Sequence, residues 1–365
     1  MSDLTLLLGG DVMLGRGVDQ ILRHPGQPEL HERHVASALG YLDLAERENG
    51  PIPRHVAPDY VWGDALPYLR DAGLSARIVN LETAVTTSGA YVPKGINYRM
   101  HPDNVDCLTA ARIDCCVLAN NHTLDWGQAG LVQTLDTLWK AHIQTAGAGR
   151  DLAQATAPAV LPLAGGDRRL LVFACALPSS GVPEEWKAGA HMPGLYLLPD
   201  LSAGSAELVA QDMQRWRRPG DIVIASIHWG GNWGYLVPQA HRRFAQALID
   251  RGADLIHGHS AHHRLGLECH RGKLILYGCG DLINDYEGIG GYAAFRPDLA
   301  ALYLPRLGTD GRLAALRVVP MQIRNFRLRT PRQSDITWFH HVLARESAAL
   351  ETSLTPLPSG EFEIR

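Results

Sequence analysis

The sequence lacks a surplus of positive charge. Its 365 residues include 34 Lys and Arg against 38 Asp and Glu, so the net charge is −4 when His is neutral. Proteins that bind nucleic acid without sequence preference neutralise phosphates with an excess of Lys and Arg. We therefore expect no nucleic-acid partner.

Long apolar runs and a basic leader are also lacking. No stretch reaches the roughly 18 uninterrupted apolar residues that are needed to cross a bilayer. The short apolar run near the N-terminus is flanked by Asp3 and Asp11, whereas a secretory signal peptide begins with positive charge. These features predict a cytoplasmic protein without a membrane partner.

Cysteine is scarce and irregularly placed. The six cysteines form no Cys-x-x-Cys pair and no zinc-ribbon spacing, and Cys115 and Cys116 are adjacent in an apolar run. This pattern indicates buried, reduced thiols rather than a disulfide framework. Histidine, by contrast, is abundant at 17 residues, which directs the search toward metal ligands and acid–base groups.

Short apolar runs alternate with amphipathic stretches along the chain. The runs expected to form strands are 4–9, 76–79, 113–119, 167–176, 221–227, 253–256 and 273–277, and the expected helices are 128–142, 206–217 and 239–251. This alternation indicates an α/β protein with at least partly parallel sheets. We expect one domain at residues 1–330, with an insertion at about 22–60 that is rich in His, Pro and Glu. Residues 331–365 are expected to add a helix, beginning near Gln333, and a loose tail.

Polar residues stand at the ends of the predicted strands. They are Asp11, Glu82, Asn121, His122, His228, His259 and His262. In open α/β sheets, ligands bind in the crevice beyond the carboxyl ends of the strands, so these residues are expected to converge. Carboxylate, amide and imidazole groups form a mixed O/N ligand set that suits Mn, Fe or Zn, or Ca or Mg with more carboxylate and water. We expect one or two divalent metal ions.

The segments that carry these residues resemble a known family. They are GDVMLGR, VNLETAVT, LANNHTLDWGQAGL, IHWGGNW, LIHGHSAHH and ILYGCGDLINDY. Together, over about residues 4–290, they look like the CapA branch of the calcineurin-like metallophosphoesterase superfamily, which is associated with capsule or poly-γ-glutamate synthesis. The resemblance implies a two-sheet β-sandwich flanked by helices in four layers (αββα). It also implies metal ligands at Asp11, Glu82, Asn121, His228, His259 and His262, and a contact of His122 with the substrate.

Two positions depart from the superfamily pattern. Its first motif is Asp-x-His, but this chain has Met13 in place of that His, as is usual in the CapA branch. The last motif, typically Gly-His-His-Pro-His in CapA-like proteins, is Gly-His-Ser-Ala-His-His here, at residues 258–263. Both changes remove nitrogen ligands from the cage with which a two-metal hydrolase holds attacking and leaving oxygens. A single metal ion is therefore a second possibility.

Other residues are candidates for catalysis and substrate binding. Asp125 either caps the helix that follows it or orients His122, since a carboxylate on one ring nitrogen fixes the tautomer. We expect the catalytic residues to be His122, Asp11, Asp125 and His259. Arg16, Lys94 and Arg99 could bind a substrate anion, although they could equally be charged residues of an exposed loop. Trp126, Trp229 and Trp233 could line an apolar substrate pocket, although we expect at least one of them to lie in the core.

Two enzymatic reactions fit this set of residues. The first is epimerisation at a peptide Cα, in which His and Asp pairs remove and return a proton. Three features favour it: the altered metal motifs, the lack of the membrane anchor expected of a capsule-assembly protein, and the tryptophans beside the motifs, which suit a peptide side chain. This reaction resembles that of the CapA-like epimerases that invert the C-terminal residue of lasso-peptide precursors. The alternative is metal-dependent hydrolysis of a phosphoester or a γ-glutamyl amide, and a non-enzymatic carbohydrate- or peptide-binding protein is a third reading. A peptide substrate is the expected partner, and the oligomeric state is left open.

Overall fold

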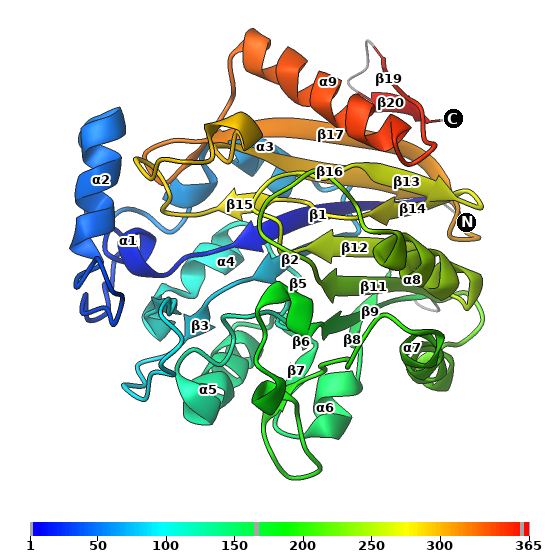
Figure 1. Ribbon diagram of the computed structural model, residues 1–365, viewed down its shortest axis with the longest axis horizontal. Helices are drawn as coiled ribbons and strands as arrows, with labels where there is room; N and C mark the ends of the chain where they lie inside the picture. The colour runs from blue at the N-terminus through cyan, green and yellow to red at the C-terminus, as the bar shows by residue number, and fades with distance from the viewer. Residues whose placement is uncertain (1–2, 164–167, 358–360, 365) are drawn as a thin grey trace.

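The computed structural model describes residues 3–163, 168–357 and 361–364. Within them the chain forms two large β-sheets with helices on their outer faces (Figure 1). The sheets contact each other where β1 (Leu4–Val12) meets β12 (Leu255–His259) and where β6 (Gln144–Ala146) meets β8 (Ala159–Pro162). The expected α/β architecture, two sheets between helical layers, is confirmed.

The first sheet has the strand order β19-β20-β17-β16-β1-β2-β5-β6, with β15 also paired to β1 and β18 to β17. Its other strands are β2 (Ala76–Leu81), β5 (Cys115–Val117), β15 (Asp281–Ile283), β16 (Leu299–Leu307), β17 (Leu313–Ile323), β18 (Leu328–Arg329), β19 (Leu354–Pro356) and β20 (Glu361–Ile364). Strands β1, β2, β5 and β6 run parallel. Each of the last three follows a helix, namely α3 (Leu66–Leu69), α4 (Asp106–Ala110) and α5 (Gly127–Lys140). The carboxyl ends of these strands consequently meet at one edge.

The second sheet has the order β13-β14-β12-β11-β9-β8. Its other strands are β9 (Arg169–Ala176), β11 (Ile222–His228), β13 (Leu267–His270) and β14 (Lys273–Leu276). Side chains of β9 alternate between two cores, since Val172 packs in the core between the sheets, whereas Phe173 packs with α7 (Ala203–Trp216) and α8 (Gln239–Asp250). A strand buried on both faces is continuously apolar, which explains the run that predicts it.

Shorter elements complete the fold. They are α1 (Arg16–Asp19), α2 (Leu39–Asn49), α6 (Leu152–Thr156), α9 (Gln333–Ala348), the strand pairs β3 (Ala84–Val85) with β4 (Arg99–Met100) and β7 (Ala148–Gly149) with β10 (Gly194–Leu195), and five 3₁₀ turns in the described residues. The expected insertion contains α2, which stands at the side of the molecule (Figure 1).

The predicted elements are present with small shifts in their bounds. Several strands run one to three residues further than expected and include the polar residue at their end, as β11 does with His228. The predicted strand 167–176 begins at a residue outside the described part of the chain, and β9 begins at Arg169. Strands β16 and β17 were not predicted. Each contains a proline, Pro305 or Pro320, and proline within an apolar run argues against a strand.

The expected loose tail is wrong in part. Helix α9 begins at Gln333 as predicted, but the chain then returns as β19 and β20, and β20 pairs with β17 of the first sheet. Phe362 is buried in the core. The predicted state of the cysteines is confirmed, because all six are free and only Cys269 is partly exposed. In the part of the chain that the structure describes, no helix has the length and apolar character that a membrane span requires.

Candidate metal centre

Two carboxylates meet where β1 pairs with β15. The strands run parallel with Asp11 opposite Asp281, and the backbone N–H of Asp11 donates to the carbonyl of Gly280 at 3.0 Å. This approach requires glycine at residue 10, because a Cβ there would lie 1.7 Å from the Gly280 oxygen. The pairing of the strands therefore sets Asp11 and Asp281 side by side.

Two histidines meet in the same way at the ends of β11 and β12. His228 pairs with His259 in the parallel register, and their Nδ1 atoms are 2.8 Å apart. Together with Asp11 they form a first group, in which one ligand atom from each residue lies within 4.8 Å of the others. Asn121 Oδ1 lies 3.1 Å from His228 Nε2, so its amide adjoins this group.

Asp11 also belongs to a second group, with His262 and Asp281. His262 Nδ1 lies 2.9 Å from Asp281 Oδ1, and Asn284 donates its amide N–H to Asp281 Oδ2 at 2.7 Å. One carboxylate shared by two groups of ligands is the arrangement of a site for two adjacent cations. Strand β15 thus adds the carboxylate of Asp281 to the candidate ligands, whereas among the described residues the nitrogen ligand that is absent at Met13 is not replaced by another nitrogen.

Glu82 lies beside both groups rather than within either. The amide of Asn80 donates to Asp11 Oδ1 at 2.7 Å and to Glu82 Oε2 at 3.3 Å. Asn80 is in turn held by the amide of Asn120, which donates to its side-chain oxygen at 2.9 Å. This chain of buried amides fixes both carboxylates at the end of β1 and β2.

The charges of this centre fit divalent cations. Burial and the charge of Asp281 raise the pKa of Asp11 to about 7, and burial together with Asp11 raises that of Glu82 well above its usual value. A cation held among crowded carboxylates would relieve this repulsion. Burial lowers the pKa of both His228 and His259, which leaves neutral imidazoles with a lone pair for a metal. Oxygen and nitrogen donors together suit Mn, Fe or Zn.

His122 stands next to the two groups in a fixed orientation. Its Nδ1 is 2.7 Å from Asp125 Oδ2, which also accepts the backbone N–H of Tyr98 at 2.6 Å. The imidazole stacks on the ring of Tyr98 with centroids 3.8 Å apart, and its Nε2 is 3.8 Å from Glu82 Oε1. The N-cap residue of α5 is Trp126, and the side chain of Asp125 contacts His122, Tyr98 and Lys94. These contacts agree with the role of orienting His122 rather than with that of a helix cap.

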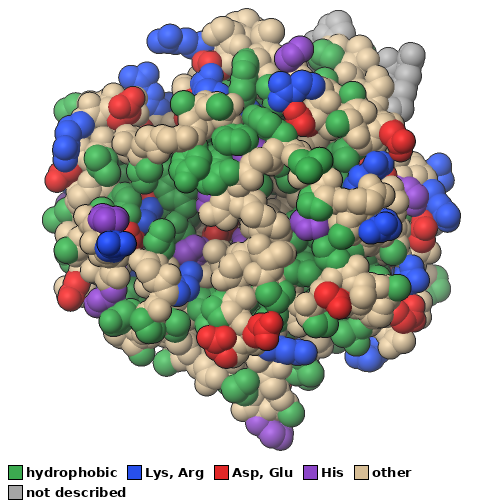
Figure 2. Space-filling model, in the orientation of Figure 1, with side chains coloured by type: hydrophobic (Ala, Val, Ile, Leu, Met, Phe, Trp, Pro, Cys, Tyr) green, Lys and Arg blue, Asp and Glu red, His purple; other side chains and the backbone are tan. Residues whose placement is uncertain are grey.

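A cavity of about 510 Å³ opens over this centre. Arg16, Lys94, His122 and His262 line it, together with several aromatic and aliphatic side chains. In Figure 2 hydrophobic side chains gather around a hollow in which histidine is visible. Lys94 Nζ is 2.9 Å from Asp125 Oδ1 and donates to the carbonyl of Asn121 at 2.6 Å.

Two of the four residues expected to bind substrate lie elsewhere. Trp229 is buried, donates its Nε1–H to the carbonyl of Tyr277 at 2.9 Å and stacks on His241. It is a core residue, because its side chain points to the helical face of β11. Arg99 places its guanidinium on the ring of Trp126 at 3.9 Å and donates to the carbonyl of Ser88, outside the cavity.

Sequence reasoning placed Trp233 at an apolar pocket but missed Asp281, Asn80 and the tyrosines that line the cavity. A signal for Asp281 was present, because Gly280-Asp281 repeats the Gly10-Asp11 pair of β1. Asn80 carries no comparable signal, since an Asn inside an apolar strand gives no indication of its partners.

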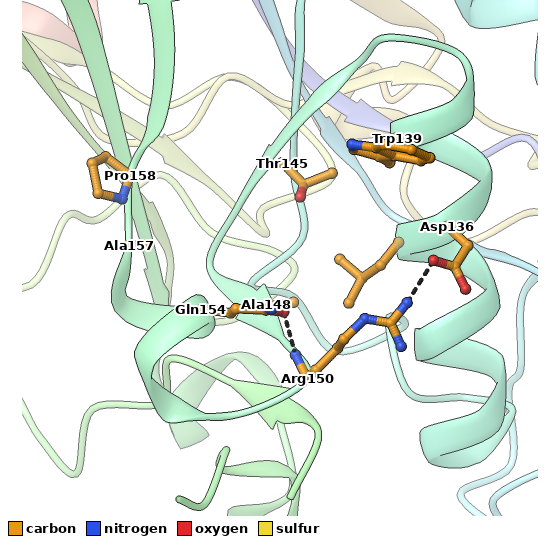
Figure 3. Close-up of a pocket in the computed structure, with 9 residues that line it drawn as sticks. Asp136, Trp139, Thr145, Ala148, Arg150, Gln154, Ala157 and Pro158 are labelled. Atoms are coloured by element: carbon orange, nitrogen blue, oxygen red, sulfur yellow. Dashed lines mark hydrogen bonds and ion pairs between the residues drawn. The ribbon is translucent and has the colours of Figure 1, made fainter. Parts of the chain in front are cut away.

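A second cavity of about 480 Å³ lies away from the metal centre, between α5 and α6 (Figure 3). Arg150 points across it and forms an ion pair with Asp136 of α5. Trp139 borders this cavity and is 74% exposed. None of the residues predicted for the site lines it.

Comparisons with known proteins identify a family and several relatives. A family model described as bacterial capsule synthesis protein PGA_cap matches residues 5–286. A probable polyglutamine synthesis accessory protein of Mycobacterium tuberculosis is 46% identical over 364 residues, which cover 99% of this chain and 96% of that protein. The PGA biosynthesis protein CapA of Bacillus subtilis is 26% identical over 76% of this chain and 62% of its own. Among solved structures, a 5'-nucleotidase precursor from Thermus thermophilus aligns with a TM-score of 0.42 and 15% identity, over 96% of this chain and 60% of that chain.

Proposed function

The chain belongs to the PGA_cap family of bacterial capsule synthesis proteins, and on that premise we propose that it is a metal-dependent hydrolase. The observation that carries the proposal is the position of Asp11, which is shared by the first group (with His228 and His259) and the second group (with His262 and Asp281). Two-metal hydrolases place adjacent cations in this way.

The residues that would hold the ions are those of the two groups, with Asn121 and Glu82 beside them. When bound, divalent ions supply Lewis acidity and lower the pKa of water enough for it to attack near neutral pH. The chain supplies the rest of the chemistry. Asn80 fixes the two carboxylates, and the cavity above the centre gives a substrate access to it.

His122 is the residue that we assign to proton transfer. Because Asp125 occupies its Nδ1, Nε2 is the ring atom left to exchange a proton with the attacking water or the leaving group. Tyr98 holds the plane of the ring by stacking, and Lys94 holds Asp125 in place through its ion pair. His122 is thus oriented by three neighbours before a substrate arrives.

We place a γ-glutamyl amide ahead of a phosphoester as the bond that is cut. The relatives are named for the synthesis of polyglutamine or PGA, and an enzyme that trims such a polymer would cut amide bonds. The test incubates protein loaded with Mn²⁺ with a γ-glutamyl anilide and with an aryl phosphate. Release of aniline that falls in both Asp11→Asn and His122→Ala supports the proposal. Release of phosphate alone would move the proposal to phosphoesters, and no cleavage of either would contradict hydrolysis.

Epimerisation at a peptide Cα is the second candidate. His122 and His262 both line the cavity, and each is paired with a buried aspartate, Asp125 or Asp281. An epimerase needs one base and one acid. The altered metal motifs favour this reaction less than the sequence indicated, because Asp281 adds a carboxylate to the second group. Incubation of a peptide in heavy water separates the candidates, since epimerisation adds one deuteron without cleavage.

A further inference from the structure

The cations that line the cavity over the metal centre already have carboxylate partners. Arg16 donates to both oxygens of Asp285, at 3.1 and 2.5 Å, and to Glu32 at 3.0 Å. Lys94 is paired with Asp125. Among the described residues that line the cavity, these are its Arg and Lys side chains, so neither offers an uncompensated positive charge to a substrate.

The rim of the same cavity is apolar. Trp233 stacks on Tyr292 with ring centroids 3.9 Å apart and an interplanar angle of 4°. Tyr292, Ile289 and Ile96 also line the cavity and are 42, 43 and 44% exposed. These are large hydrophobic surfaces left open to solvent, and covering them with an apolar group would be favourable.

This apolar rim reaches the metal centre. The ring of Trp233 lies 5.4 Å, centroid to centroid, from the imidazole of His262, which belongs to the second group. Tyr286 also lies beside His262, with ring centroids 5.3 Å apart, and its hydroxyl is hydrogen-bonded to that of Tyr98 at 2.6 Å. These two hydroxyls are therefore already hydrogen-bonded to each other, and the substrate meets mainly ring surfaces next to the ligands.

We propose that the substrate carries an uncharged apolar or aromatic group directly beside the bond that reacts, and that this group lies on Trp233 and Tyr292. The inference rests on the proposed function, because it takes the metal centre as the anchor of the substrate. A polymer with a carboxylate on every residue would lose hydration of its carboxylates at this apolar rim. Because no unpaired Arg or Lys of the described cavity lining compensates for that loss, such binding costs free energy. Among γ-glutamyl amides, the structure favours those whose neighbouring residue is apolar.

The test measures binding, independent of which bond is cut. Three hydroxamates share one metal-binding group and differ only in their tail: acetohydroxamate, 3-phenylpropionohydroxamate and the monohydroxamate of succinate. Calorimetry of the Mn²⁺-loaded protein gives the Kd of each. We expect the phenyl compound to bind roughly tenfold more tightly than acetohydroxamate, and the carboxylate compound to gain nothing.

Two variants test whether the tighter binding of the phenyl compound comes from the apolar rim. Trp233→Ala and Tyr292→Ala should each lower the affinity ratio of the phenyl compound to acetohydroxamate by roughly fivefold or more. Tyr292 is partly exposed, so its variant serves if Trp233→Ala does not fold. Trp139→Ala, which removes an exposed tryptophan at the cavity in Figure 3, is the matched control and should keep the ratio of the wild-type protein.

Each outcome decides the proposal. Tighter binding of the carboxylate compound than of the phenyl compound overturns it, as does a phenyl gain that persists in both rim variants. If acetohydroxamate itself fails to bind, the metal centre and the proposed function fail, and this inference falls with them. Binding of acetohydroxamate without a phenyl gain contradicts the inference alone.

Discussion

At the scale of single residues, Asp281 is the position that tests whether the centre holds one metal ion or two. It shares the second group with Asp11 and His262, and no other described carboxylate completes that group. We predict that Asp281→Asn lowers the metal content from two equivalents to one, because the first group of Asp11, His228 and His259 stays intact. Elemental analysis of the purified proteins measures this. Asp43→Asn, at an exposed position of α2, is the control, and a variant that retained two equivalents would contradict the assignment.

Under the proposed function, Asp125 would act on the reaction through His122. Its carboxylate fixes Nδ1 at 2.7 Å, and an oriented imidazole transfers protons more efficiently than one free to rotate. We predict that Asp125→Asn lowers kcat by roughly 10- to 100-fold while the metal content stays unchanged. Steady-state kinetics and metal analysis of the same preparation test both parts. A parallel loss of metal would show that Asp125 supports the fold of the site instead.

At the scale of elements, the pairing of β1 with β15 brings two backbones so close that a side chain does not fit between them. A Cβ at residue 10 would overlap the carbonyl oxygen of Gly280, so Gly10→Ala must separate the strands and with them Asp11 and Asp281. We predict a loss of more than about 3 kcal/mol in the free energy of unfolding together with loss of metal. Gly89→Ala, where an added Cβ meets nothing within 4 Å, is the control. Denaturant titration of both variants gives the comparison.

The C-terminal strands are part of the first sheet, and this too can be tested. Phe362 of β20 is 4% exposed and faces the core, opposite Leu316 of β17. Truncating a buried Phe costs about 3–5 kcal/mol, so Phe362→Ala should lower the free energy of unfolding by an amount in that range. A loose tail would predict no change, and an unaltered denaturation midpoint would support that earlier expectation.

At the scale of the whole molecule, buried histidines make the free energy of unfolding depend on pH. His241 of α8 stacks on Trp229, and burial lowers its pKa to about 4, compared with 6.5 when unfolded. As the pH falls from about 6.5 to about 4, the unfolded chain binds a proton at this site and the folded protein does not. The contribution of the neutral ring is therefore complete above pH 6.5 and is lost progressively within this window.

His241→Phe keeps the aromatic stack and removes the titration. We predict that the free energy of unfolding of the wild-type protein falls by about 2 kcal/mol more than that of His241→Phe between pH 7.5 and pH 5. Urea denaturation at the two pH values measures the difference. Equal losses in the two proteins would mean that His241 is protonated in the folded state.

The two sheets are also joined by a histidine. His257 of β12 contacts the carbonyl of Gly9 in β1 through Nε2 at 2.9 Å and the hydroxyl of Ser226 through Nδ1 at 3.0 Å. It is fully buried. The ends of β1 and β12, which carry Asp11 and His259, are thereby held at a fixed distance although they belong to different sheets.

The sequence by itself determined most of the strands and helices around the site and the polar residues at the ends of those strands, but not β16, β17 or the C-terminal strands. Apolar runs such as that of β9 report burial on both faces, and a polar residue after such a run marks the edge where ligands bind. For this reason the positions of Asp11, His122, His228 and His259 could be predicted together. These are local properties, because each depends on the period and the end of a single element.

Only the tertiary structure decided which of these residues meet and what surrounds them. The register of β1 against β15 brings Asp281 to Asp11, and Arg16 is neutralised by Asp285, 269 residues away along the chain. Two neighbouring tryptophans are separated in the same way, since Trp229 enters the core and Trp233 the cavity. Strand pairing and packing set these contacts. No local sequence pattern predicts them, because the partners are distant along the chain.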